Sequence, residues 1–392
     1  MNEKIKQLSQ AMIPWLREQR RYLHMHPEAS AMEYETSRYL RQVLEELGYE
    51  VEGGFYNTGL AVTIPGGKSG PVTGMRFDID ALAMEELCTH DYVSQNPGFM
   101  HACGHDAHAA IGLGVAKALR ELKADLAGTV KLIFQPAEED SPNGGGAQYM
   151  IRDGVLENPH VDRIFGIHIY PAAEKGTVIT RPGIMTAASD PFTLTITGKG
   201  AHASTPQMGL DPIMTGGYVL TALQSIVGRN IDPFDQAVVT VGVFNGGTRY
   251  NVIPESVTME GTVRTFREEV RQKVAERVKQ VVTATSEAMG CTASIDYRLS
   301  YPSLTNDGEL VESSVVKIKD QLGEAAVQFL DKPLSGSEDF SYFAMERPAM
   351  FMFLGVRTED NGHEALHNPY FDFDEACLAE GVEALLSLVI QP

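Results

Sequence analysis

The chain has 392 residues, 43% of them hydrophobic and 21% charged, and this length and composition predict a globular protein of two domains. Its 32 basic residues are outnumbered by 52 acidic ones, which argues against nucleic acid or an anionic membrane as a partner. No apolar run approaches the about 18 residues of a membrane span, the first residues lack the apolar core of a signal peptide, and four cysteines are too few for a disulfide framework. We therefore expect a cytoplasmic protein that binds neither nucleic acid nor a membrane.

The first half of the chain alternates between helical and strand patterns. Helices show apolar residues at a helical period, and strands are short apolar segments bounded by glycine or proline. The predicted elements are, in order, a helix over 33–47, strands over 60–64 and 72–77, a helix over 106–123 and strands over 129–134 and 163–167. Strands that alternate with helices predict an α/β fold with a mostly parallel sheet covered on both faces.

The pattern changes near residue 190, where apolar residues and threonines alternate over 192–197 as in a sheet with one solvated face. The elements that follow read strand, helix, strand, strand, helix, strand, which is the ferredoxin-like order. After Pro302 the first style returns, with a helix near 308–322, a strand over 350–354 and a last helix near 373–389. We therefore predict a catalytic domain formed by 1–187 plus 304–392, interrupted by a small inserted α+β domain over 188–303.

The segment 101–108, His-Ala-Cys-Gly-His-Asp-Ala-His, is the densest group of side chains that could carry chemistry. Cys103 and His105 are two residues apart, so an extended loop would point both side chains the same way and let them reach one metal ion. In a regular helix the two side chains would point in different directions and could not reach the same ion. The simpler alternative is a helix N-terminus with Asp106 as its cap and the histidines packed nearby.

Three further segments place ligand-type side chains at the ends of predicted strands. The strand over 129–134 runs into Glu138 and Glu139, His168 follows the next strand, and His367 lies between the last strand and the last helix. Each segment alone has a simpler interpretation, a solvated acidic turn or a structural histidine. A parallel sheet, however, brings the carboxyl ends of its strands together, so these residues are expected to meet.

A cysteine, three histidines and a glutamate, with carboxylates to spare, suit a site for two divalent cations. The thiolate and the imidazoles favour zinc, cobalt, nickel or manganese over magnesium or calcium. Neighbouring residues that leave a strand tend to point apart, so we expect one of Glu138 and Glu139 to bind metal while the other acts as general base. Because a metal lowers the pKa of its water to about 7, the expected chemistry is hydrolysis by metal-bound hydroxide.

Eight motifs occur in an order that is typical of one family. They are Arg76-Phe-Asp78-Ile-Asp80-Ala-Leu, Met100-His-Ala-Cys-Gly-His-Asp-Ala-His108, Gln135-Pro-Ala-Glu-Glu139, Gly166-Ile-His168, Gly198-Lys-Gly-Ala-His202-Ala, Asn251-Val-Ile-Pro254, Gly261-Thr-Val-Arg-Thr-Phe266 and Ser335-Gly-Ser-Glu-Asp-Phe340. With them the chain resembles, nearly end to end, the metal-dependent aminoacylase and carboxypeptidase family. It is most similar to the amidohydrolase branch that holds hippurate hydrolase, indole-acetyl-amino-acid hydrolases and aminobenzoyl-glutamate hydrolase subunits.

The resemblance implies a di-metal, peptidase-like catalytic domain. Cys103 would bridge two divalent ions, manganese or zinc, with cobalt or nickel as alternatives, and Glu138 would be the general base. The other metal ligands would be His105, Glu139, His168 and His367.

The resemblance also implies a role for the inserted domain, which would be a lid that carries the contact of a homodimer. His202 would reach toward the developing oxyanion, often from the partner subunit. Asn251 and Arg264 would hold the carboxylate of the substrate.

The function implied is metal-dependent hydrolysis of the amide bond of small N-acyl amino acids, of the aminoacylase or hippurate hydrolase type. A dipeptidase or carboxypeptidase, or an aminobenzoyl-glutamate hydrolase, would use the same chemistry with a different pocket. A cysteine hydrolase based on Cys103 with His105 or His108 would leave the other ligand-type residues unexplained, and chelator sensitivity would exclude it. A non-catalytic metal-binding scaffold would have no need of a base at Glu138.

Overall fold

The computed structural model describes residues 1–390, which form two compact units. Unit 1 comprises residues 1–185, 305–333 and 339–390, and unit 2 comprises Thr186–Leu304 together with Leu334–Glu338. Each unit has its own hydrophobic core. We describe the two units separately.

An eight-stranded sheet forms the centre of unit 1, with the strand order β1-β2-β4-β3-β5-β16-β6-β15. Its strands are β1 (Val51–Phe55), β2 (Gly59–Pro65), β3 (Lys68–Asp78), β4 (Ala127–Gln135), β5 (Arg163–Glu174), β6 (Val178–Thr180), β15 (Val327–Phe329) and β16 (Ala349–Arg357). The four adjacent strands β4, β3, β5 and β16 are parallel, whereas β1, β2 and the β16–β6 pair are antiparallel. The prediction of an α/β fold with a large, mostly parallel sheet is confirmed.

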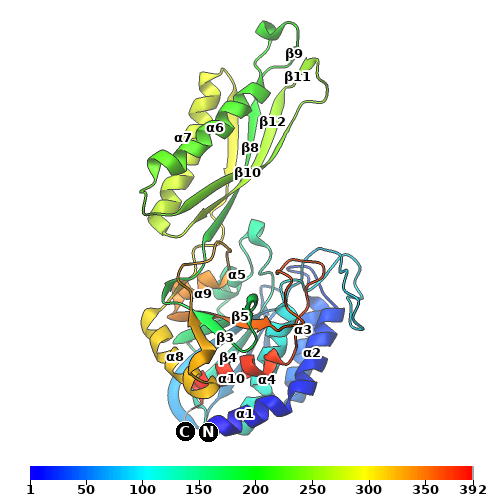
Figure 1. Cartoon of the computed structure of the whole chain (residues 1–392), viewed down its shortest axis with the longest axis vertical. Helices are drawn as coiled ribbons and strands as arrows, with labels where there is room; N and C mark the ends of the chain where they lie inside the picture. Colours follow the sequence, from blue (N-terminus) through cyan, green and yellow to red (C-terminus); the bar gives the residue numbers. More distant parts are fainter. Residues whose placement is uncertain (391–392) are drawn as a thin grey trace. The chain divides into compact units, whose positions relative to one another are not determined.

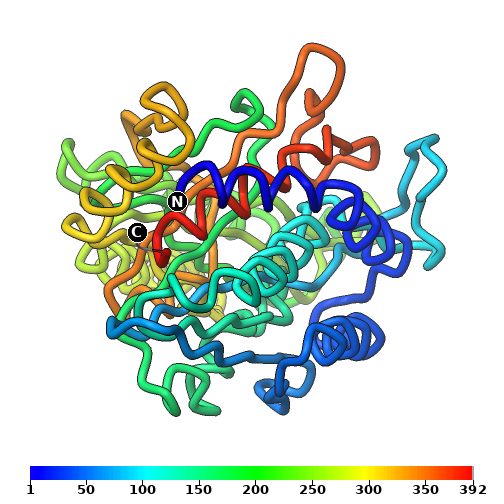
Figure 2. Tube along the Cα trace, turned by 90° about the horizontal axis from the view of Figure 1, so that it is seen from below, coloured from blue at the N-terminus to red at the C-terminus, as the bar shows by residue number. Residues whose placement is uncertain are grey.

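The helices of unit 1 come from both ends of the chain. They are α1 (Asn2–Ala11), α2 (Ile13–Met25), α3 (Tyr34–Glu46), α4 (His105–Leu122), α5 (Ala147–Arg152), α8 (Gly308–Leu322), α9 (Phe340–Glu346) and α10 (Cys377–Val389), with short 3₁₀ turns at Ser141–Asn143 and Glu324–Ala326. Figure 2 shows α1, in blue, running alongside α10, in red, and the two helices are in contact. The sequence patterns do not indicate α1 or α9, whereas the end of α2 near Arg21–Glu28 and the start of α5 after Gly144-Gly-Gly146 are expected from the sequence.

Strand β5 shows how helices cover both faces of the sheet, because successive residues of a strand point to opposite faces. Phe165 and Ile167 lie in the core cluster that includes residues of α4 and α10. Gly166, between them, faces α9, where an added Cβ would come within 3.0 Å of the Phe340 ring. The central parallel strands are therefore buried on both sides, which explains their nearly continuous apolar sequence.

Helix α4 packs unusually close to the sheet. A Cβ at Gly112 would lie 2.7 Å from the Phe77 ring of β3 and 2.9 Å from the Phe134 ring of β4, so a larger residue would force the helix outward. This close approach fixes the first turn of α4, with His105, at the carboxyl ends of these two strands.

Unit 2 is an antiparallel sheet of order β10-β12-β8-β13 with two helices on one face (Figure 1). Its main elements are β8 (Ala188–Thr197), α6 (Pro212–Asn230), β10 (Ala237–Gly246), β12 (Ser256–Thr265), α7 (Glu268–Ala288) and β13 (Thr292–Tyr297). The alternating residues Phe192, Leu194 and Ile196 of β8 are buried against apolar residues of α6 and α7. The chain order of these elements is the ferredoxin-like one.

Two short ribbons complete the fold. β9 (Ala201–His202) pairs with β11 (Val252–Ile253) in unit 2, where Pro206–Met208 forms a 3₁₀ turn. β7 (Gly183–Ile184) pairs with β14 (Thr305–Asn306) in unit 1, where the chain leaves for unit 2 and returns. The sequence patterns did not indicate either ribbon, because two-residue strands have no measurable periodicity.

Candidate metal centre

The strand register of unit 1 brings the predicted ligand residues to one level of the sheet. Asp78, the last residue of β3, pairs with Gln135, the last residue of β4, and His168 of β5 pairs with Phe353 of β16. Strand β5 continues to Glu174, so His168 lies within the strand and does not follow it. We use the name Cys103 cluster for six residues of unit 1 at this edge: Cys103, His105, Glu138, Glu139, His168 and His367.

Cys103 precedes α4 in a tight turn. Gly104 has φ 81°, and a Cβ there would lie 2.0 Å from the Ile169 side chain, so this position requires glycine for both its conformation and its space. The simpler alternative, in which Asp106 caps the helix, is wrong. The Asp106 carboxylate is buried within α4 and accepts hydrogen bonds from Arg20 at 2.7 Å and His24 at 2.8 Å.

Two imidazoles of the cluster, those of His168 and His367, each place Nε2 close to the Cys103 thiol. His168 Nδ1 donates to the Ile169 carbonyl at 2.7 Å, and its Nε2 lies 3.4 Å from Cys103 Sγ. His367 Nε2 lies 3.3 Å from the same sulfur, and its backbone N–H donates to the Ala102 carbonyl. In His168 one ring nitrogen is fixed while the other faces the sulfur, which is the usual arrangement of a metal-binding histidine.

His108, although part of the same sequence segment, is fully engaged elsewhere. Its Nε2 accepts the backbone N–H of Ile169 at 2.9 Å, so its proton lies on Nδ1, which donates to Asp78 at 2.5 Å. Neither nitrogen is left for a metal or a substrate.

The turn after β4 sets the positions of Glu138 and Glu139. Ala137 adopts the left-handed conformation, with φ 57°, and its backbone N–H donates to the buried carboxylate of Glu33 at 2.9 Å. The turn breaks the alternation of side chains, and a carboxylate oxygen of each glutamate lies within 4.8 Å of the other and of a His105 nitrogen. The expectation that the two side chains point apart is therefore wrong.

The arrangement of the cluster fits divalent cations. Ligand atoms of Cys103, His105 and His168 lie within 4.8 Å of one another, as do those of Cys103, Glu139 and His367. Among the described residues, buried His105 Nε2 has no hydrogen-bond partner, and Glu139 Oε1 lies 3.0 Å from His367 Nε2 without an aligned hydrogen bond. A thiol, imidazoles and carboxylates with unsatisfied atoms close together form a donor set that divalent cations would complete.

The electrostatics of the cluster reflect an excess of negative charge. Burial and the carboxylates of Glu139 and Glu138 raise the pKa of the Cys103 thiol well above its usual value. Burial lowers the pKa of His105, but the carboxylates of Asp78 and Asp80 outweigh it and raise the pKa to about 10. Burial and the neighbouring His108 lower the pKa of His168. Bound cations would relieve the repulsion among the carboxylates.

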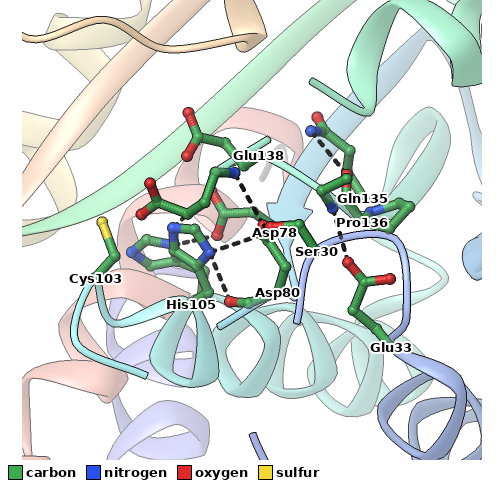
Figure 3. A network of polar contacts seen from close by, with 12 residues as sticks. Ser30, Glu33, Asp78, Asp80, Cys103, His105, Gln135, Pro136 and Glu138 are labelled. Carbon is green, nitrogen blue, oxygen red and sulfur yellow. Dashed lines mark hydrogen bonds and ion pairs between the residues drawn. The ribbon is translucent and has the colours of Figure 1, made fainter. Parts of the chain in front are cut away.

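Asp80 organises two members of the cluster, and the site prediction had omitted it. Its backbone carbonyl and its Oδ1 accept from His105 Nδ1 at 2.9 and 3.1 Å, while its Oδ2 accepts from Ser30 at 2.6 Å and from the Glu139 backbone N–H at 2.9 Å (Figure 3). Asp80 therefore orients one ligand-type imidazole and anchors the Glu139 backbone. The available signal was its position, two residues after the end of β3.

His202 lies in unit 2, exposed, on strand β9. Its Nδ1 accepts the backbone N–H of Ser204 at 3.1 Å, so in the neutral ring the proton lies on Nε2. The exposed side chain therefore presents an N–H donor. An oxyanion accepts hydrogen bonds, so this tautomer of His202 could donate one to it.

Asn251 and Arg264 are far apart within unit 2. Asn251 adjoins the β9–β11 ribbon, where its carbonyl accepts from Ala203 N, whereas Arg264 pairs with Ser189 at the other end of the sheet. The eight residue steps from Ser256 to Arg264 along β12 span about 26 Å. Among the described residues, Arg264 Nη1 is buried without a hydrogen-bond partner. One chain thus brings His202 and Asn251 together but not Asn251 and Arg264.

The chain has close relatives among known proteins. N-acetyl-L-cysteine deacetylase of Bacillus subtilis (strain 168) is 40% identical over 360 residues, which cover 92% of this chain and 83% of the relative. IAA-amino acid hydrolase ILR1-like 4 of Arabidopsis thaliana is 40% identical over 380 residues, covering 95% and 84%. The crystal structure of the Bacillus subtilis YXEP protein, described as a dinuclear metal binding peptidase from the M20 family, matches with a TM-score of 0.82 at 34% identity, covering 96% and 97%.

The fold and these relatives define the class of the protein, which is a metal-dependent amidohydrolase. Within that class, residues 74–391 match the profile of Peptidase family M20/M25/M40, and the chain belongs to this family. The family resemblance drawn from the motifs is thereby confirmed. In residues 1–390, no helix combines the length and the apolar character needed to cross a membrane.

Proposed function

We propose that the protein hydrolyses the amide bond of N-acyl amino acids at the Cys103 cluster, with two bound divalent cations. The observation that carries the proposal is the meeting of one thiol, three imidazoles and two carboxylates at the carboxyl edge of the parallel sheet. Relatives that bear the names N-acetyl-L-cysteine deacetylase and IAA-amino acid hydrolase support this substrate class. The substrate is a small molecule.

Within the cluster, Cys103 lies between two groups of donors and would contact both cations. Cys103 forms one group with His105 and His168 and another with Glu139 and His367, the ligand atoms of each group lying within 4.8 Å of one another. Manganese or zinc suits this set, with cobalt or nickel as alternatives. Such cations, when bound, acidify water and polarise a carbonyl.

Glu138 is the proposed general base. It is 6% exposed, and its Oε1 lies 3.5 Å from the backbone N–H of Asp339, which holds the carboxylate at the edge of the cluster. From there it would take a proton from the attacking water and pass it to the nitrogen of the leaving amino acid.

Unit 2 is proposed as a lid and as the contact of a homodimer. β10 is an edge strand of its sheet, and both β10 and the adjoining α6 expose large apolar side chains, including Val243, Phe244, Met214 and Tyr218. An exposed apolar edge strand is a typical pairing surface. The separation of Asn251 from Arg264 also supports a dimer, because both can reach one substrate only if they come from different chains.

A substrate panel tests the function. The apo protein, prepared with a chelator, is reloaded with manganese, zinc or cobalt and assayed on hippurate, N-acetyl amino acids, aminobenzoyl-glutamate and dipeptides. We expect turnover of N-acyl amino acids that depends on added metal. A preference for dipeptides would indicate a dipeptidase. Full activity in the chelated protein would indicate a cysteine hydrolase. If the metal-loaded protein turns over none of the substrates, it is a non-catalytic metal-binding scaffold.

Replacing Cys103 with alanine tests the metal set. We expect Cys103→Ala to bind fewer metal ions per chain, because the sulfur is the atom that both donor groups share. Cys291→Ala is the matched control: Cys291 is also buried, but it lies in unit 2 against Thr215. Elemental analysis of the two purified variants decides the point, and equal metal contents would refute the proposed ligand set.

Replacing Arg264 tests carboxylate binding. Arg264→Ala should raise KM for substrates with a free carboxylate by about 10- to 100-fold, since a hydrogen bond between charged groups is lost. The effect should be small for the same substrates in amidated form. Arg298→Ala, which removes an exposed arginine of the same unit, serves as the control. An equal effect on both forms of the substrate would contradict the role.

A further inference from the structure

Unit 1 holds a second group of ligand-type side chains that shares no residue with the Cys103 cluster. Ligand atoms of His24, Glu86 and His90 lie within 4.8 Å of one another. His24 Nε2 forms a hydrogen bond of 3.3 Å with Glu86 Oε1, and His90 Nε2 lies 3.2 Å from the same oxygen. The side chains of His24 and Glu86 are 0% and 3% exposed, and that of His90 is 14% exposed.

Each of the three side chains is fixed by a separate contact on its far side. His24 Nδ1 donates to Asp106 at 2.8 Å, and Asp106 is itself bound by Arg20. Glu86 Oε2 accepts the backbone N–H of Ser94 at 2.6 Å. The His90 ring stacks on Tyr92 with the ring centroids 3.7 Å apart. A carboxylate on the remote nitrogen of a histidine is the common second contact of a metal ligand.

The contact between His90 and Glu86 is not an aligned hydrogen bond. Among residues 1–390, neither ring nitrogen of His90 has a hydrogen-bond partner, although Nε2 lies 3.2 Å from the Glu86 oxygen. Two ligand atoms that lie close together without forming an aligned hydrogen bond are expected where both bind the same metal ion. Tetrahedral zinc with ligand distances near 2.0 Å places neighbouring ligand atoms about 3.3 Å apart, close to the 3.2 Å between His90 Nε2 and Glu86 Oε1.

A neighbouring histidine adds an independent indication of a missing partner. His101 is 1% exposed, its ring centroid lies 6.4 Å from that of His24, and neither of its nitrogens finds a hydrogen-bond partner in the described part of the chain. Buried imidazoles normally have partners. Unsatisfied ring nitrogens at both His90 and His101 therefore point to a bound species in this region.

We infer that His24, Glu86 and His90 bind a third divalent cation of the zinc class, separate from the two proposed at the Cys103 cluster. Such an ion would tie helix α2, which carries His24, to the irregular segment 83–99, which carries Glu86 and His90. The two ends of that segment are joined by the Leu82–Met100 bridge, and the chain then runs directly into His101 and Cys103. The third ion therefore has a structural role: it holds helix α2 and the segment 83–99 together, next to the residues that lead into the Cys103 cluster.

Metal content tests the inference. Full-length protein is saturated with Zn²⁺, separated from free ion by gel filtration and analysed for zinc and protein. We expect His90→Ala to hold one zinc ion per chain fewer than the wild type. Glu86→Gln, whose amide oxygen can still accept from Ser94, should lose the same ion. His160→Ala is the matched control, because it removes an exposed histidine that also contacts a glutamate, and its zinc content should equal that of the wild type.

The Cys103→Ala background separates this inference from the proposed function. His90→Ala should remove one further ion in that background too, whether or not the Cys103 cluster binds metal. In cobalt-loaded Cys103→Ala protein, absorption from nitrogen- and oxygen-ligated cobalt should persist, and adding His90→Ala should lower it by the contribution of one ion per chain. Equal zinc contents in the wild type, His90→Ala and Glu86→Gln would overturn the inference.

Discussion

Glu138→Gln is expected to lower kcat by about 10² to 10⁴ while leaving the metal content unchanged. Glutamine has nearly the size of glutamate and can keep the contact of its side-chain oxygen with the Asp339 backbone N–H. It cannot take a proton from water, however, so the base is lost and the shape of the site is retained. Steady-state kinetics together with elemental analysis of the same preparation measure both quantities.

Glu139→Gln is the matched control for this experiment, because it makes the same chemical change one residue away. Glu139 Oε1 lies 3.0 Å from His367 Nε2 in the group that contains Cys103, so its loss should weaken metal binding. If Glu139→Gln keeps its metal and loses turnover while Glu138→Gln loses its metal, the ligand and the base have been assigned the wrong way round.

His202→Ala is expected to lower kcat by about 10² to 10³, which is the usual cost of removing one donor to a developing oxyanion. The metal content should not change, because His202 is an exposed residue of unit 2 and the proposed ligands all belong to unit 1. Ser204→Ala is an informative companion variant. It keeps the backbone N–H that fixes the His202 tautomer and removes only the hydroxyl contact, so a much smaller effect is expected.

Mixing the impaired His202→Ala and Glu138→Gln variants tests whether His202 of one chain acts in the active site of the other chain of the proposed dimer. A dimer of one His202→Ala chain and one Glu138→Gln chain would contain one complete site if each site takes its histidine from the other chain. Activity should then reappear after subunit exchange. Exchanged dimers without recovered activity would place His202 in the site of its own chain or in none.

Much of the fold was predictable because its signals are local. The period-2 alternation of residues 192–197 and the helical stripe of 33–47 correspond to β8 and α3. The meeting of His168 with Cys103 followed from a different argument, since parallel strands must bring their carboxyl ends together. No measured distance was needed for that expectation.

Other features depend on contacts that a sequence pattern does not contain. The left-handed Ala137, which turns Glu138 and Glu139 toward the same point, is held by Glu33, more than a hundred residues earlier. Asp80 acts through bonds to His105, Ser30 and Glu139 that no spacing reveals. The position of Arg264, eight residues along β12 from Ser256, is known only from the strand register.

The β7–β14 pair places the two ends of the inserted segment 186–304 side by side, with Ile184 directly opposite Thr305. An insertion that starts and ends on adjacent backbone can be shortened, enlarged or exchanged without changing the spacing of the strands in the large sheet. Variation that accumulates between residues 186 and 304 therefore leaves the positions of Cys103 and His367 intact. With the proposed substrate contacts Asn251 and Arg264 inside this segment and the proposed metal ligands outside it, changes in substrate binding and changes in hydrolysis would fall on separate segments of the gene.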